Sequence, residues 1–118
     1  MLTEKTHTGG FLISEADGKR SRENVTLASG QDLYDGAVLG KISSGGEYTA
    51  LDQGASDGSQ TAAGILYGRG DASTAALAVC IIARDAEVNG DELLWGSESP
   101  TEVATGITEL ATLGIIVR

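Results

Sequence analysis

The sequence has little of the chemistry on which catalysis and metal binding depend. Among its 118 residues there is one histidine, His7, and one cysteine, Cys80. A catalytic triad needs its base on a rigid frame, but His7 lies in a polar N-terminal stretch. Zinc sites combine several cysteine and histidine ligands. We therefore expect no enzyme, no metal and no cofactor. Cys80 has no internal disulfide partner, and its apolar surroundings predict a buried, inert thiol.

Aromatic residues and proline are also scarce. Aromatic side chains make up 4% of the chain, and there is one proline against 17 glycines. The core must therefore depend on valine, isoleucine, leucine and alanine, and the glycines favour turns and short strands over a helical bundle. A hydrophobic fraction of 41% argues against a disordered chain. A chain of this length normally forms one domain.

Long hydrophobic runs and excess positive charge are absent too. No apolar run is long enough to cross a membrane, and no apolar core of a signal peptide is visible at the N-terminus. The formal net charge is −9, and an acidic surface repels phosphate backbones. We expect neither a membrane nor a nucleic acid as partner, and synthesis in a cytoplasm.

What charge there is divides unevenly along the chain. Residues 1–22 have four basic residues against three acidic ones, a net charge of +1. Residues 23–118 have four basic residues against fourteen acidic ones, a net charge of −10. The first segment also has no sustained apolar period, and its patch Phe11-Leu12-Ile13 is too small to form a core. We predict a flexible N-terminal arm at 1–22, poorly ordered until it meets a partner, on a compact domain at 23–118.

Short apolar segments separated by glycine-rich turns predict a mainly β domain. The alternation of Val25 and Leu27 with polar residues is typical of a half-buried strand, and Gly45-Gly46 predicts a tight hairpin. The run Leu77–Ala83 predicts a strand buried on both faces. Polar turns or loops are predicted at 30–36, 53–61 and 68–75. The expected strands cover residues 23–29, 37–43, 48–51, 62–67, 77–83 and 115–117.

One helix is predicted late in the chain. Ser99 and Glu102 have the spacing of a capping box, and Pro100 suits the first helical position. Apolar residues then recur at helical spacing, and Gly114 is a natural C-terminal stop. The apolar face is expected to consist of Val103, Ile107, Leu110 and Ala111.

Two other classes of function remain open at this point. A small carbohydrate- or ligand-binding β module would need a concave face, to which only Tyr34, Tyr48, Tyr67 and Trp95 could contribute rings. Trp95 is otherwise expected in the core or at a contact between subunits. An enzyme with a carboxylate pair would draw on the acidic turn, although solvated charges are the simpler interpretation. The acidic residues of that turn are Asp85, Glu87, Asp91 and Glu92.

The order of these segments resembles the head decoration proteins of tailed bacteriophages, the group that includes the phage lambda decoration protein. A polar arm, a glycine-rich body of short strands, a late capped helix and an apolar last strand follow one another in both. The likeness extends from about Phe11 to the end of the sequence. The most specific stretches are Arg20–Thr26, Gly58–Tyr67, Ala83–Asn89 and Leu113–Arg118.

This resemblance implies a β-clip-like fold and a homotrimer that binds the outside of an expanded phage head at three-fold positions and stabilises it. The partner it implies is the major capsid protein, and the location is the capsid exterior after synthesis in the host cytoplasm. The family's N-terminal arm contacts the capsid. Carried over to this sequence, that role falls on Leu2, Phe11, Leu12, Ile13, Lys19, Arg20 and Arg22.

Overall fold

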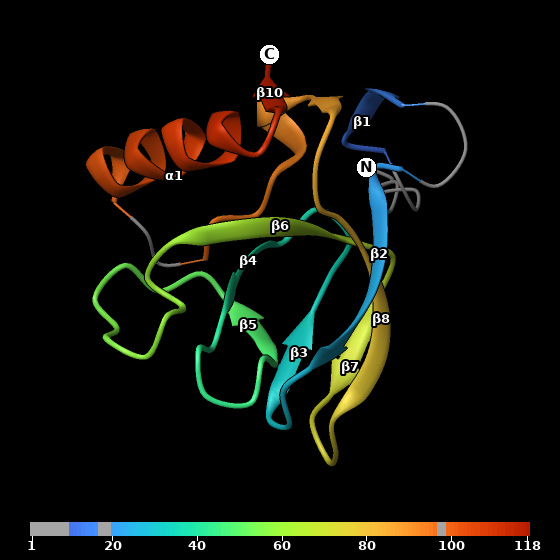
Figure 1. The fold of residues 1–118 in the computed structure, drawn as a ribbon, viewed down its shortest axis with the longest axis vertical. Helices are drawn as coiled ribbons and strands as arrows, with labels where there is room; N and C mark the ends of the chain where they lie inside the picture. Colours follow the sequence, from blue (N-terminus) through green and yellow to red (C-terminus); the bar gives the residue numbers. More distant parts are fainter. Residues whose placement is uncertain (1–9, 17–19, 97–98) are drawn as a thin grey trace, which may run out of the picture.

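A computed structural model describes residues 10–16, 20–96 and 99–118. These residues form ten short strands, one 3-10 helix and one α-helix (Figure 1). The strands are β1 (Leu12–Glu15), β2 (Arg22–Leu27), β3 (Gln31–Leu33), β4 (Val38–Lys41), β5 (Tyr48–Ala50), β6 (Ala62–Tyr67), β7 (Gly70–Ala72), β8 (Leu77–Ile82), β9 (Ala86–Val88) and β10 (Ile115–Val117). The helices are η1 (Gly90–Glu92) and α1 (Pro100–Thr112).

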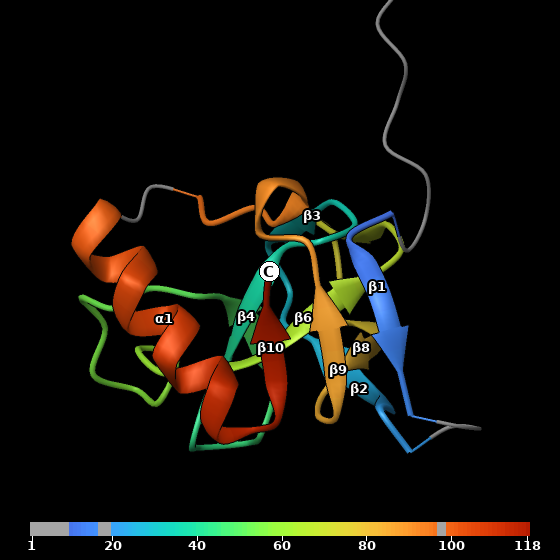
Figure 2. The same cartoon turned by 90° about the horizontal axis from the view of Figure 1, so that it is seen from above.

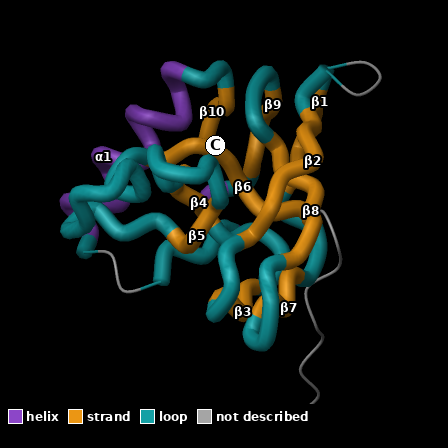
Figure 3. The backbone as a smooth tube through the Cα atoms, turned by 60° about the horizontal axis from the view of Figure 1, so that its bottom comes forward, coloured by secondary structure: helices purple, strands orange, loops and turns teal. Residues whose placement is uncertain are grey.

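Five strands close into a small barrel in the order β2-β5-β4-β6-β8. Strands β2 and β8 form its longest antiparallel pairing, from Arg22 opposite Ile82 to Leu27 opposite Leu77. Strands β4 and β5 form the hairpin that Gly45 and Gly46 predict, and both glycines have positive φ angles. At one end of the barrel, β3 pairs with β7 as a separate two-stranded ribbon (Figure 3).

The remaining elements form a second layer, which we call the outer layer: β1, β9, β10 and α1. Strand β9 is central, with β1 antiparallel on one side and β10 parallel on the other. Helix α1 lies beside β10 (Figure 2). The layer therefore joins a segment near the start of the chain to the last residues of the chain.

Two apolar cores follow from this arrangement. The first lies inside the barrel and includes Leu39, Leu66 and Ile81. The second lies between the barrel and the outer layer and includes Val38, Ile65 and Ile82. Neighbouring residues of β4, β6 and β8 thus point to opposite cores, as the alternation of side chains along a strand requires. The barrel wall is the surface on which the outer layer packs.

The capping box at the start of α1 is confirmed. The Ser99 hydroxyl accepts a hydrogen bond from the Glu102 backbone N–H, and the Glu102 carboxylate accepts one from the Ser99 N–H. Leu110 is fully buried, whereas Ala111, expected on the same face, is exposed. Gly114 follows the helix with a φ of +84°, which glycine adopts without strain.

The prediction of a mainly β chain with one late helix is confirmed, but four strands were missed. One is β1, in the segment predicted as an arm. The segment predicted as a turn at 30–36 contains β3, the loop at 68–75 contains β7, and the acidic turn contains β9. Each of these last three has three residues, too few to show a periodic pattern. These strands are stabilised by partners distant in the sequence, such as β1 and β10 on either side of β9.

The prediction that β8 is buried on both faces is wrong. Leu77 is 38% exposed and Ala78 is also exposed, while Ile81 and Ile82 at the other end are fully buried. The first half of the strand extends past the two cores. Cys80 is half-buried there, so its expected full burial is wrong as well.

Candidate functional site

The N-terminal segment is fixed to the body by an aromatic anchor. Phe11 has no exposed surface and belongs to the core beneath the outer layer. Its carbonyl accepts a hydrogen bond from the Asn89 N–H, and β1 continues the pairing along β9. The patch is too small to form a core of its own, as expected, but Phe11 completes a core that β9 and the barrel wall provide.

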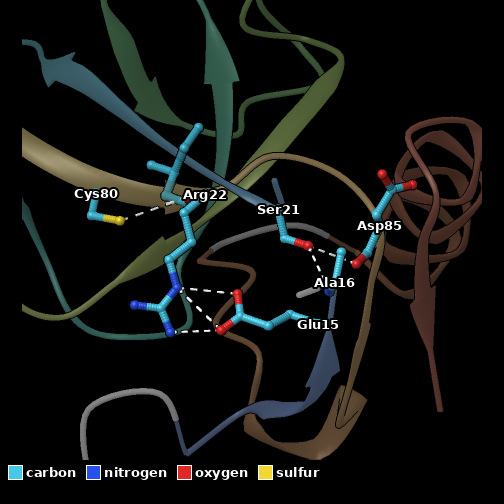
Figure 4. A network of polar contacts seen from close by, with 7 residues as sticks. Glu15, Ala16, Ser21, Arg22, Cys80 and Asp85 are labelled. Carbon is cyan, nitrogen blue, oxygen red and sulfur yellow. Dashed lines mark hydrogen bonds and ion pairs between the residues drawn. The ribbon is translucent and has the colours of Figure 1, made fainter. Parts of the chain in front are cut away.

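A buried serine fixes the other end of β1. Ser21 is fully buried, and its hydroxyl donates to the Asp85 carbonyl at 2.8 Å (Figure 4). The same hydroxyl accepts from the Ala16 backbone N–H at 3.0 Å. Asp85 has a φ of 51°, the only positive value among the described residues other than glycine. Ser21 thus links three separate pieces of backbone: the end of β1, the start of β2 and the β8–β9 turn.

Arg22 makes a second link between β1 and β2. Its guanidinium donates to both carboxylate oxygens of Glu15, with a shortest distance of 2.7 Å (Figure 4). It also lies over the Tyr67 ring, 4.3 Å from the centroid. The hydrogen bonds to Glu15 raise the pKa of Arg22 above its ordinary value, although partial burial acts against this. Two-oxygen pairs of this kind are stronger than ordinary surface ion pairs.

The other basic residues of the described part also have partners within the chain. Arg20 is paired with Asp85, and Arg84 with Glu23. Lys41 differs, since it lies over the Tyr48 ring at 5.9 Å, at the edge of the range for a cation–π contact. The acidic character follows from the excess of 17 acidic over 8 basic residues in the chain. The two remaining ion pairs are Arg69 with Asp32 and Arg118 with Glu87.

The seven residues predicted to contact a capsid have different environments. Leu2 and Lys19 lie outside the described residues. Phe11 is buried, Leu12 is half-buried, and Ile13 is 54% exposed at a bulge in β1. Arg20 is exposed but ion-paired, and Arg22 is engaged with Glu15. Ile13 is thus the described member of the apolar patch that a partner can reach.

The acidic turn does not form a paired-carboxylate site. Glu87 is in β9 and pairs with Arg118, Asp85 pairs with Arg20, and Asp91 and Glu92 form part of η1. Among residues 10–16, 20–96 and 99–118, no three histidine, cysteine or acidic side chains come together as metal ligands would. In the same ranges, no helix combines the length and apolarity that a membrane crossing needs.

Each of the three tyrosines has a cation over its ring. Arg69 lies 4.3 Å from the centroid of Tyr34, as Arg22 does from that of Tyr67. Tyr48 is buried, and burial raises the pKa of its hydroxyl. Trp95 is half-buried and packs against the outer-layer core and against Gly106 of α1, where a Cβ would clash with the indole. The expectation of core packing for Trp95 is confirmed.

Two hollows lie on the described surface. The larger, of about 540 Å³, is wide open and has Lys41, Tyr48 and Arg84 in its wall. The smaller, of about 110 Å³, is mainly apolar and is formed by the end of β3, the start of β4 and the stretch Leu94–Gly96. The four large aromatic side chains considered for ligand binding do not share one concave face: Tyr34 and Trp95 line the small hollow, Tyr48 lines the large one, and Tyr67 lines neither.

Sequence reasoning did not identify Ser21 or Glu15. Serine and glutamate usually lie at the surface, and nothing in their neighbours distinguishes them. One signal was available: Ser21 lies between Arg20 and Arg22, within the stretch Arg20–Thr26 that is among the most specific for the family resemblance.

The polar groups of this site, Ser21 and Arg22, hold β1 against β2 and against the β8–β9 turn. The fold and this site define a mainly β protein whose buried polar groups serve its structure. Its sequence matches the family model of bacteriophage lambda head decoration protein D over residues 1–115. The chain belongs to that family of structural capsid proteins, which are not enzymes. It is a phage head decoration protein, located on the virion capsid. Among curated proteins, no sequence matches this chain.

Proposed function

We propose that this chain binds the outside of an expanded phage head at the three-fold positions of the shell, as a homotrimer, and stabilises the shell there. Its partner is the major capsid protein. The match to the decoration family over residues 1–115 is the observation that carries the proposal. The same match favours decoration over a small-ligand module. A body with a strong excess of acidic residues also suits the exterior of a shell better than its DNA-filled interior.

Stabilisation requires no chemistry beyond binding. A protein that binds the expanded shell and not its precursor shifts the equilibrium toward the expanded state. At each site, the free energy of stabilisation grows with the logarithm of the ratio of the free decoration protein concentration to its dissociation constant. Repetition over many equivalent positions makes a modest affinity at each position sufficient.

The proposed contact element is the N-terminal segment 1–22 on the body 23–118. Within it, Phe11, Ser21 and Arg22 anchor the segment to the fold. We place the capsid contact on Ile13 and on the chain before Gly10, which includes Leu2. Lys19 and Arg20 add positive charge to the same segment of the sequence.

The test uses empty heads in both states. Expanded and unexpanded heads are incubated with the purified protein, sedimented, and the bound copies counted per capsid subunit. We expect saturation near one copy per capsid subunit on expanded heads and little binding to unexpanded ones. Equal binding to both states would exclude stabilisation by population shift.

A second pair of measurements addresses the contact and the assembly. Ile13→Asp should weaken binding to expanded heads, while Ile116→Asp, a matched exposed isoleucine on β10, should not. Crosslinking of the bound protein should give trimers. Monomers on saturated heads would contradict the homotrimer.

A further inference from the structure

Five large apolar side chains are exposed on the described surface, and two of them lie around one hollow. Tyr34 is 59% exposed and Leu94 is 45% exposed, and both line the 110 Å³ hollow together with Trp95. A hollow of this size suits a single aliphatic side chain rather than a small-molecule ligand. The other three are Ile13, Leu77 and Ile116.

The hollow is preformed and nearly neutral. Trp95 is fixed by its contact with Gly106, and Val38 and Leu51 in its floor belong to the outer-layer core. Asp32 is the one charged residue in its lining. Arg69 neutralises Asp32 and also lies over the Tyr34 ring. An apolar group therefore enters without leaving a buried charge unpaired.

A complementary projection lies on the β7–β8 hairpin. The six residues from Ser73 to Ala78 are all exposed and include no charged side chain. Leu77 is the large apolar residue among them, at 38% exposure. The hairpin projects past the barrel in Figure 1. Leu77 is not part of the wall of its own hollow, so the two surfaces are separate.

Charge limits where two copies of this chain can meet. Each has a net charge of −9, so contact through most of the surface is opposed by repulsion. The uncharged hairpin and the neutral hollow avoid that cost, and an anchor residue in a pocket is the usual centre of a stable interface. Because the two patches differ, two copies that meet through them are arranged head-to-tail, and the pair still has one free hollow and one free hairpin. Further copies can add at these free patches, and a closed ring forms when the rotation between successive copies brings the last copy back to the first.

We propose that Leu77 of one copy occupies the hollow lined by Tyr34, Leu94 and Trp95 of the next copy, and that three such contacts close the ring. This inference rests on the homotrimer of the proposed function. It assigns the interface to the β7–β8 hairpin and to the end of β3 with the stretch after η1. The exposed side of β1, which includes Ile13, then stays available for the capsid.

The experiment compares Leu77→Asp, Leu94→Asp and the control Ile116→Asp by light scattering over a range of concentrations. Each of the first two should raise the concentration for half-assembly at least about tenfold, the effect of losing one anchor. Ile116→Asp should assemble like the original chain. Circular dichroism and thermal melting check the fold, and Leu77→Ala with Leu94→Ala replace the aspartates if either variant unfolds.

Mixing provides the sharper result. Leu77→Asp keeps an intact hollow and Leu94→Asp keeps an intact hairpin, so an equimolar mixture can form one good contact but not a ring. We expect dimers in the mixture, at concentrations where each variant alone is monomeric. Trimers of either variant alone at wild-type concentrations, or a mixture without dimers, would overturn the interface.

The binding assay separates the two failures. If both aspartate variants form normal trimers and still bind expanded heads, the interface is wrong and the proposed decoration stands. If the original chain is monomeric both in solution and on heads, the proposed homotrimer fails, and the interface with it.

Discussion

The barrel and the outer layer differ in how far apart along the chain their strands lie. Every barrel strand comes from residues 22–82, and one neighbouring pair, β4 and β5, is joined by a short hairpin. The outer layer instead combines β1 with β9, α1 and β10 from the last third of the chain. The barrel closes within residues 22–82, whereas the outer layer needs contacts across almost the whole chain.

The two regions also depend on each other unequally. Val38, Ile65 and Ile82 of the barrel wall form the floor of the outer-layer core. The outer layer therefore cannot form its core without the barrel. The barrel's own core, with Leu39 and Leu66, does not include residues of β1, β9 or α1. This asymmetry predicts that damage to the outer layer leaves the barrel partly intact.

The largest effect should come from deleting residues 1–22. The deletion removes Phe11, Ser21 and Arg22, and with them β1 and its links to β2 and β9. We expect the melting temperature to fall steeply, with loss of protection in β9 and β10. Deleting residues 1–9 removes none of these contacts and should leave the melting temperature unchanged. If both truncations melt alike, the anchoring role of β1 is wrong.

Phe11→Ala tests the anchor alone. Removing a fully buried phenylalanine costs about 3–5 kcal/mol of the free energy of unfolding. Amide hydrogen exchange should speed up more in β1, β9 and β10 than in the barrel, because the outer layer opens separately. Leu39→Ala, on the barrel side, should instead speed exchange in both regions.

The matched control for Phe11 is Ile13→Ala. Ile13 is two residues away and 54% exposed, so its truncation should change the free energy of unfolding by no more than about 0.5 kcal/mol. Uniform acceleration of exchange by Phe11→Ala would mean that the two regions unfold as one unit.

Ser21→Ala should have a smaller effect, confined to the junction of the two regions. It leaves the Asp85 carbonyl without the hydroxyl donor and the Ala16 N–H without the hydroxyl acceptor. A buried group left unpaired costs about 1–3 kcal/mol of the free energy of unfolding. Here the Ala16 N–H still donates to the Asp85 carbonyl at 3.1 Å, so we expect a loss near the lower end of that range. Denaturant unfolding measures the change, and exposed Ser29→Ala should be neutral.

The smallest effect concerns Asp57, in the loop between β5 and β6 on the barrel side. Hydrogen bonds from the Ser59 hydroxyl and backbone N–H lower the pKa of Asp57. A lowered folded-state pKa contributes stability above the unfolded pKa, and that contribution is lost as pH falls through the folded value. Ser59→Ala should move the pKa of Asp57 back toward its ordinary value in an NMR titration. An unchanged pKa of Asp57 would show that the Ser59 hydroxyl does not lower it.

The sequence predicts the barrel better than the outer layer for a physical reason. Strands such as β2 and β6 have enough residues to show alternation or an apolar run. The dipeptide Gly45-Gly46 marks the β4–β5 hairpin from its own residues alone. The capping box at Ser99 is equally local. By contrast, β9 has only three residues, with Glu87 at its centre, and exists because β1 and β10 flank it.

The candidate site follows the same division. Polarity and charge in residues 1–22 predicted an arm, and the single patch at Phe11 was interpreted as a contact for another protein. Its true partner within the chain is a core formed by β9, β10 and the barrel wall, which no local pattern of the arm encodes. Arg22 was chosen for its charge, but its pairing with Glu15 depends on β1 returning alongside β2.

The parallel pairing of β10 with β9 has a consequence for synthesis. A chain leaving the ribosome has all five barrel strands once Ile82 has emerged, so the barrel can close before β10 is available. The sheet that covers Phe11 is complete only when Ile115–Val117 have emerged. Until then the nascent chain presents an uncovered phenylalanine and an unpaired strand edge at β9. Burial of Phe11 is therefore completed only after the barrel has formed.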